Sequence, residues 1–141
     1  MSLPQFTTDS LIDFALRAAI YSVIQSPQVS RANVMNILEI FSGESDADAA
    51  ITLTIAHILR QEARGEINRK TSRELVKILL RIKEEGGEEK GELARRFLGY
   101  YRWLFDVLEK MKRMGFRIDL REVPNITFRD FLKRFVIGFS R

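Results

Sequence analysis

The stretch RRFLGYYRWLF, residues 95–105, contains the two side-chain types that bind single-stranded nucleic acid. The guanidinium groups of arginine bind phosphate oxygens, and aromatic rings stack on bases. On a helix, however, positions 93, 97, 100, 104, 107, 111 and 114 form a heptad row, and positions 94, 98, 101, 105 and 108 form a second apolar row beside it. Two adjoining rows are typical of a wide buried face, so we predict that the side chains remaining outside are Arg95, Arg96, Arg102 and Trp103.

Trp103 shares its helical sector with Arg96, Gly99, Asp106 and Lys110, all of them three, four or seven residues away. Two interpretations of this tryptophan are open. It packs under the last helix or under a loop, or it is an exposed aromatic side chain beside arginines. In the second case it would stack on a base or anchor a protein partner.

Cations also recur at helical spacing elsewhere in the chain. Arg73, Lys77 and Arg81 lie four residues apart and therefore line one helix face, either as a row that follows a phosphate backbone or as a solvated face beside Glu74 and Glu84. Residues 110–141 carry nine cations against three acidic residues. The candidate nucleic-acid-binding residues are Arg69, Lys70, Arg73, Lys77, Arg81, Arg95, Arg96, Arg102, Trp103, Lys110, Arg129, Lys133 and Arg134.

The composition is that of one globular domain with a strong charge asymmetry. The 141 residues are 45% hydrophobic and 30% charged, and they include no cysteine, which excludes disulfides and thiolate metal sites. Residues 1–57 have a net charge of −4 and residues 58–141 a net charge of +8. This asymmetry indicates a polyanionic partner or head-to-tail packing of copies. Arginine outnumbers lysine by 16 to 7, which suits phosphate binding but also occurs in heat-stable proteins.

No motif in the chain predicts catalysis. The single histidine, His57, lies between apolar neighbours on an expected helix, where a structural role is the better interpretation. Acidic pairs such as Asp46 and Asp48 fall at helix starts, where capping explains them. The segment EEGGEEKGE lacks the Gly-Lys-Ser/Thr ending of a phosphate-binding loop. We therefore expect a non-enzyme without a catalytic residue, metal site or cofactor.

Apolar periodicity and capping patterns predict an all-α, single-domain bundle of about six helices over residues 1–141. We expect helices at about 10–25, 31–41, 45–65, 71–85, 92–114 and 127–139, a mobile charged loop at 84–92 and a short extended segment near 116–121. The N-terminus lacks the basic region of a signal peptide, and no apolar segment reaches the length of a membrane span. These features favour a cytoplasmic protein without membrane contact.

Three segments of the basic half carry a resemblance to a known family. KTSRELVKILLRI, residues 70–82, resembles the Thr-Ser-containing helix start of the small helical subunits of type III CRISPR effector complexes. ARRFLGYYR and TFRDFLKRFV fall where that family has its later helices, so the likeness covers about half of the chain. It implies a non-catalytic subunit that repeats along a filament and lines the channel for guide RNA and target strand. The residues to which it assigns this role are Lys70, Arg73 and Lys77, and more loosely Arg95, Arg96, Arg129, Lys133 and Arg134.

Three functions follow, in order of preference. The first is a nucleic-acid-binding subunit of a larger ribonucleoprotein, which grips the backbone of single-stranded RNA or DNA beside other protein subunits. The second is a viral or archaeal interaction, structural or adaptor module whose apolar helix stripes bind a protein partner or another copy of the chain. The third is a helix-turn-helix-like DNA-binding regulator, although the turn at 65–70 is long for that motif and the expected recognition helix has no Asn or Gln.

Overall fold

The computed structural model describes residues 6–137, and these residues form an all-α bundle, as the sequence predicts. The α-helices are α1 (Thr8–Ile24), α2 (Arg31–Ser42), α3 (Ala47–Ala63), α4 (Arg69–Glu85), α5 (Lys90–Arg113) and α6 (Phe128–Phe131). Two 3₁₀ segments, η1 (Gly87–Glu89) and η2 (Leu120–Asn125), and a π-helical segment, η3 (Leu132–Ile137), complete the elements. The expected end of the last helix near residue 139 lies outside the described residues.

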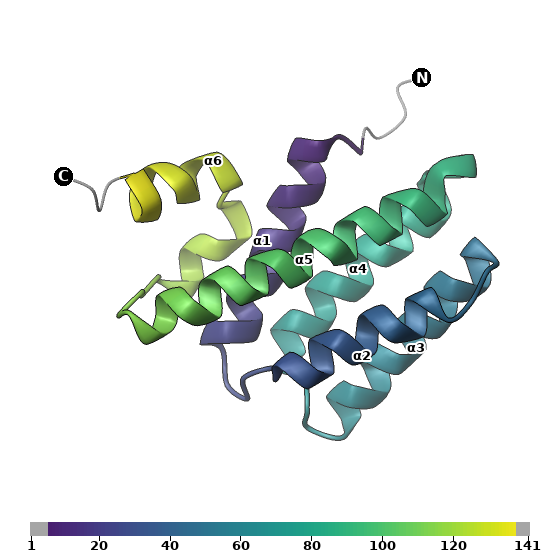
Figure 1. Cartoon of the computed structure of the whole chain (residues 1–141), viewed down its shortest axis with the longest axis horizontal. Helices are drawn as coiled ribbons and strands as arrows, with labels where there is room; N and C mark the ends of the chain where they lie inside the picture. The colour runs from purple at the N-terminus through teal and green to yellow at the C-terminus, as the bar shows by residue number, and fades with distance from the viewer. Residues whose placement is uncertain (1–5, 138–141) are drawn as a thin grey trace.

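Helix α1 is the central element of the bundle (Figure 1). It packs along α5 and against α4, and its fully buried residues include Leu11, Leu16 and Ile20. In Figure 1, α5 crosses in front of α1 and α4, the α2–α3 pair covers one side, and α6 lies at the other end of the molecule. α1 is therefore the support against which both α4 and α5 are oriented.

Two helices have their capping residue three positions before Ser10 and Thr71, the caps that the sequence predicts. Thr7 caps α1 in a reciprocal capping box with Ser10, and Asn68 caps α4 by accepting the Thr71 amide at 2.8 Å. Thr71, the predicted cap of α4, is instead buried in its first turn. The choice of Asn68 has a tertiary cause, because its side-chain amide also donates to the Tyr21 carbonyl at the end of α1, at 3.0 Å.

A buried group of hydroxyls joins the three central helices. The Tyr101 hydroxyl of α5 lies 2.8 Å from Ser22 Oγ of α1, and Ser22 Oγ lies 3.2 Å from Thr71 Oγ1 of α4. Ser22 also donates to the Ala18 carbonyl at 2.8 Å. Burial raises the pKa of the Tyr101 hydroxyl well above its usual value, so the group stays a neutral hydrogen-bonding partner.

Residues 84–92 do not form the loop that their composition predicts. α4 runs to Glu85, η1 follows, and α5 begins at Lys90, so helical structure covers most of the segment. The reversal needs little more than Gly87, whose φ of +61° glycine adopts readily. Asp48 of α3 holds both ends of the turn, at 3.5 Å from Lys83 Nζ and 2.9 Å from Lys90 Nζ. The hydrogen bond from Lys90 is the main cause of the lowered pKa of the Asp48 carboxyl.

The expected extended segment near 116–121 is shorter than predicted and forms no strand. Residues 116–119 have no regular structure, and η2 begins at Leu120. Phe116 is buried and meets the rings of Phe131 and Phe135 at centroid distances of 6.0 and 4.9 Å. The alternation of apolar and charged residues over 116–121 thus comes from a connecting segment that packs its apolar side chains on the core. Thr127 caps the next helix as predicted, but α6 gives way to η3 after one turn.

Candidate nucleic-acid interface

Helix α5 buries one broad face and exposes the opposite one. The second apolar row, from Ala94 to Leu108, is fully buried as predicted, together with Leu93, Phe97 and Leu104 of the heptad row. The heptad row fails beyond that point, because Val107 and Met114 are 46% and 78% exposed. A straight α-helix drifts by about 20° per heptad, so a row spaced at 3.5 residues leaves the buried face along a long helix.

Trp103 is exposed, which excludes its packing under the last helix or a loop. Its exposed fraction is 66%, and its ring makes one tilted aromatic contact, with Tyr100 at a centroid distance of 5.7 Å. Tyr100 is itself half-buried. Trp103 therefore contacts the neighbouring Tyr100 ring while most of its surface faces solvent.

Cations surround Trp103 on the α5 outer face, a name we give to Arg95, Arg96, Gly99, Arg102, Trp103, Asp106 and Lys110. Arg95 forms an ion pair with Glu92, and Arg96 donates to Thr8 Oγ1 at 3.3 Å. Asp106 pairs with Arg31 of α2 at 3.9 Å. Within residues 6–137, Arg102 and Lys110 have no ion-pair or hydrogen-bond partner among the side chains. Asp106, the acidic residue of this face, thus pairs with another helix. Arg102 and Lys110 remain unpaired within residues 6–137.

The cations of α4, which we call the α4 basic row, are Arg69, Lys70, Arg73, Lys77 and Arg81. Lys77 pairs with Glu74 at 3.1 Å and Arg81 with Glu85 at 3.8 Å. The Arg81 guanidinium also lies over the rings of Phe6 and Phe14, at 5.4 and 5.6 Å.

Elsewhere in the row, Lys70 lies 5.6 Å from the centre of the Tyr21 ring. Arg69 and Arg73 are exposed, and no partner for either lies in the described part of the chain. More than half of the α4 basic row is therefore engaged within the fold.

The cations near the C-terminus form a third group. Arg134 pairs with Glu122 of η2 at 2.8 Å and lies over the Phe135 ring at 4.8 Å. Arg129 and Lys133 are exposed, with no ion-pair partner among residues 6–137. α6 and η3 lie at one end of the molecule (Figure 1), and α6 packs on α1. The predicted binding residues thus come from three parts of the fold: α4, α5 and the α6–η3 segment.

Two basic residues that the sequence analysis did not select also contribute to these surfaces. Arg17 of α1 lies 5.7 Å from the centre of the Phe14 ring and donates through Nε to the Ile126 carbonyl at 3.0 Å. Arg113 is exposed near the end of α5, three residues after Lys110. Helical spacing from Lys110 would have identified Arg113, whereas nothing local to Arg17 indicates its contacts.

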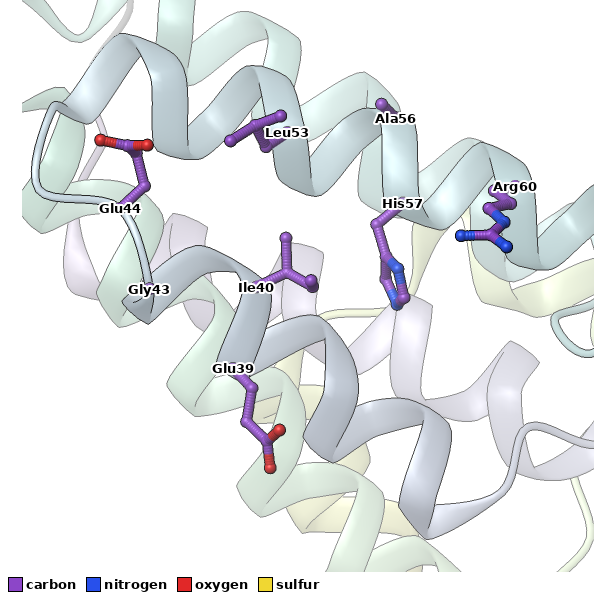
Figure 2. Close-up of a pocket in the computed structure, with 8 residues that line it drawn as sticks. All are labelled: Glu39, Ile40, Gly43, Glu44, Leu53, Ala56, His57 and Arg60. Atoms are coloured by element: carbon purple, nitrogen blue, oxygen red, sulfur yellow. The ribbon is translucent and has the colours of Figure 1, made fainter.

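A groove of about 480 Å³ lies between α2 and α3 (Figure 2). In Figure 2, Ile40 points from α2 toward α3, and His57 points from α3 toward α2. Burial, and to a lesser extent Arg60, lowers the pKa of His57, whose Nε2 lies 3.5 Å from the Gln61 side-chain amide. The groove contains none of the predicted binding residues.

Within residues 6–137, no three or more His, Asp or Glu side chains are grouped so that they could hold a metal ion. No helix in that range is both long enough and apolar enough to cross a membrane. Comparison of the chain with models of protein families, with curated protein sequences and with solved structures finds no match. The function is therefore argued from the geometry of the α5 outer face.

Proposed function

We propose that the protein binds single-stranded nucleic acid through the α5 outer face, without catalysis and without reading sequence. The observation that carries this proposal is the exposure of Trp103 beside uncommitted cations. A base stacks on an exposed indole whatever its identity, since every base has a π-face. Arg102, one residue before Trp103, and Lys110, seven residues after it, would bind the flanking phosphates.

The exposed side chains of this face favour backbone contact over base reading. The α5 outer face presents arginine, lysine and tryptophan, and α5 contains no Asn or Gln, the residues that read adenine in pairs of hydrogen bonds. Its affinity should therefore not require a particular order of bases and should fall steeply as salt is added.

The α4 basic row supports a second and weaker contact in this proposal. Arg69 and Arg73 offer exposed guanidinium groups, and the resemblance of residues 70–82 to small CRISPR subunits gives Lys70, Arg73 and Lys77 the same role. On this basis we place the protein beside other subunits in a larger ribonucleoprotein, where α4 and α5 would meet different stretches of nucleic acid.

The proposal has a direct optical test because Trp103 is the only tryptophan in the chain. Titration with short single-stranded RNA and DNA should quench its fluorescence, and the affinity should fall with a log–log salt slope of about −0.7 per phosphate contact. Duplex of the same length should bind less tightly and should leave the fluorescence nearly unchanged. Absence of binding at low salt would contradict the proposal.

A second candidate function is a protein-interaction module, which the exposed apolar residues of α5 favour. Val107 and Met114 extend the line of Trp103 toward the end of the helix, and Trp and Met are enriched at protein interfaces. Light scattering distinguishes this candidate. A stable oligomer that a Val107→Ser, Met114→Ser variant converts to monomers, with no nucleic-acid affinity in either form, would replace the first proposal with this one.

A further inference from the structure

Gly99 occupies a position in the middle of α5 at which the fold itself does not require glycine. The other glycines of residues 6–137 have internal reasons: Gly65, Gly87 and Gly115 adopt positive φ, and a Cβ at Gly43, Gly86 or Gly91 would press on neighbouring atoms. Apart from its two chain neighbours and the nearby backbone of its own helix, no atom lies within 4 Å of a Cβ added at Gly99. Glycine in a helix interior nonetheless makes the helix less stable than alanine would.

The space left by Gly99 adjoins the exposed indole. Gly99 precedes Trp103 by one helical turn, so the two residues lie on the same side of α5. The ring contact with Tyr100 keeps the indole beside position 100, and no indole atom comes within 4 Å of where a Gly99 Cβ would be. The half-buried Gly99 backbone therefore has open space above it, one turn from a mostly exposed aromatic ring.

Cationic side chains border the Gly99 backbone on the same helix. Arg95 and Arg96 lie about one turn before Gly99 or slightly less, and Arg102 lies three residues after it. Arg95 is exposed and Arg96 and Arg102 are half-buried. A planar group lying over Gly99 against the indole would therefore have positive charge on both sides along the helix.

We infer that Gly99 and Trp103 form a seat for one unpaired nucleobase, which stacks on the indole and passes close over the Gly99 backbone. This inference rests on the proposed function and specifies its substrate as a strand with an accessible, unstacked base. A base inside a duplex has both faces covered by its neighbours and does not enter the seat. A purine, with its larger ring system, covers both the indole and the glycine, so purine-rich strands bind more tightly than pyrimidine-rich strands.

The test is the Gly99→Ala variant, which changes no charge and should separate stability from binding. The variant should unfold at a higher temperature than the wild type because alanine favours the helix. Its affinity for a purine-rich single strand should nevertheless fall by about tenfold, in the range of a lost base-stacking contact. Gly99→Leu, which fills the seat further, should weaken binding more while keeping the helix.

Two controls make the result specific. Asn36→Ala, at an exposed position of α2, raises helix propensity away from α5 and should stabilise the protein without changing its affinity. An abasic strand, which offers phosphates but no base, should bind the wild type and Gly99→Ala equally, with the same dependence on salt.

The failures are distinguishable from one another. If the wild type binds no single strand, the proposed function is wrong and the inference falls with it. If the wild type binds and quenches Trp103 but Gly99→Ala binds equally well, the inference is wrong while the proposed function stands. If Gly99→Ala keeps its affinity and loses self-association, the glycine serves a protein contact, which also overturns the inference.

Discussion

Helices α4 and α5 carry similar numbers of cations, but the two helices use them differently. On α4, Lys77 and Arg81 face glutamates of the same helix, and Arg81 lies over two rings that precede or belong to α1. On α5, Arg102 and Lys110 flank an exposed indole and have no such partners in the described part of the chain. Two helices with similar numbers of cations thus differ in how many of those cations contact the rest of the fold.

The basic side chains of α4 and α5 differ in the residues that lie next to them. α4 packs against α1, and Lys70 and Arg81 lie over the Tyr21 and Phe14 rings of α1. On α5, Arg96 reaches Thr8 of α1 and Asp106 pairs with Arg31 of α2, whereas Arg102 and Lys110 contact no other helix through an ion pair or hydrogen bond within residues 6–137. Four predictions should sharpen or break this contrast, and the first has the largest expected effect.

Reversing two charges on α5 should have a far larger effect on binding than reversing two on α4. Arg102→Glu with Lys110→Glu should weaken single-strand affinity by about a hundredfold, since each charge-assisted hydrogen bond contributes roughly 1.5 kcal/mol. Arg73→Glu with Lys77→Glu is the matched control and should weaken it by only about threefold. Fluorescence anisotropy with a labelled strand measures both. Equal losses would remove the contrast between the helices.

Removing the indole should lower affinity without changing the salt dependence. Trp103→Ala should weaken binding by roughly 1–2 kcal/mol, because stacking is lost while phosphate contacts remain. Trp103→Phe, which keeps a smaller ring, should recover part of the affinity. Anisotropy across a salt series gives both quantities, and the expected sign is a lower affinity with an unchanged slope. An unchanged affinity for Trp103→Ala would assign binding to another surface.

Removing Arg81 should affect stability rather than binding. Arg81→Ala should lower the free energy of unfolding by about 1 kcal/mol, because its guanidinium rests on Phe6 and Phe14 and its stem covers apolar surface. Arg102→Ala, the counterpart on α5, should change stability by less than about 0.5 kcal/mol. Urea denaturation followed by circular dichroism decides between them. Equal stability of the two variants would show that the contacts of Arg81 contribute no more to the free energy of unfolding than those of Arg102.

The smallest effect is expected at Lys77, whose pair with Glu74 is exposed on the lysine side. Lys77→Gln should lower the free energy of unfolding by about 0.3 kcal/mol, as exposed pairs at this helical spacing do. Adding salt to the wild type should remove a similar amount. A loss above about 1 kcal/mol in urea denaturation would mean that the pair is more than a surface contact.

The sequence predicted those features that depend on periodicity within one helix. The buried row of α5, the sector of Trp103 and the amphipathic face of α4 all follow from the spacing of apolar residues. The ion pairs of Arg31 with Asp106 and of Arg134 with Glu122 did not follow, because they join segments whose relative positions the fold determines. The start of α4 was misplaced for the same reason, since Asn68 is selected by a carbonyl of α1.

The sequence likewise did not predict which cations contact other helices of the fold. Arg81 and Arg102 each lie among basic residues on a helix, but Arg81 contacts Phe14 of α1 and Glu85 of its own helix, whereas Arg102 has no such partner among residues 6–137. Trp103 could be assigned to a sector of α5, but whether another segment covers that sector depends on where the chain goes after residue 115.

The buried hydroxyl of Tyr101 has a consequence for the opposite side of α5. Its bond to Ser22 fixes the angle at which the helix is rotated about its own axis. Successive residues of an α-helix are about 100° apart, so the residue two positions later points roughly 200° away. The buried hydrogen bond of Tyr101 therefore determines the direction in which Trp103 leaves the helix, and a contact in the core orients a side chain on the surface.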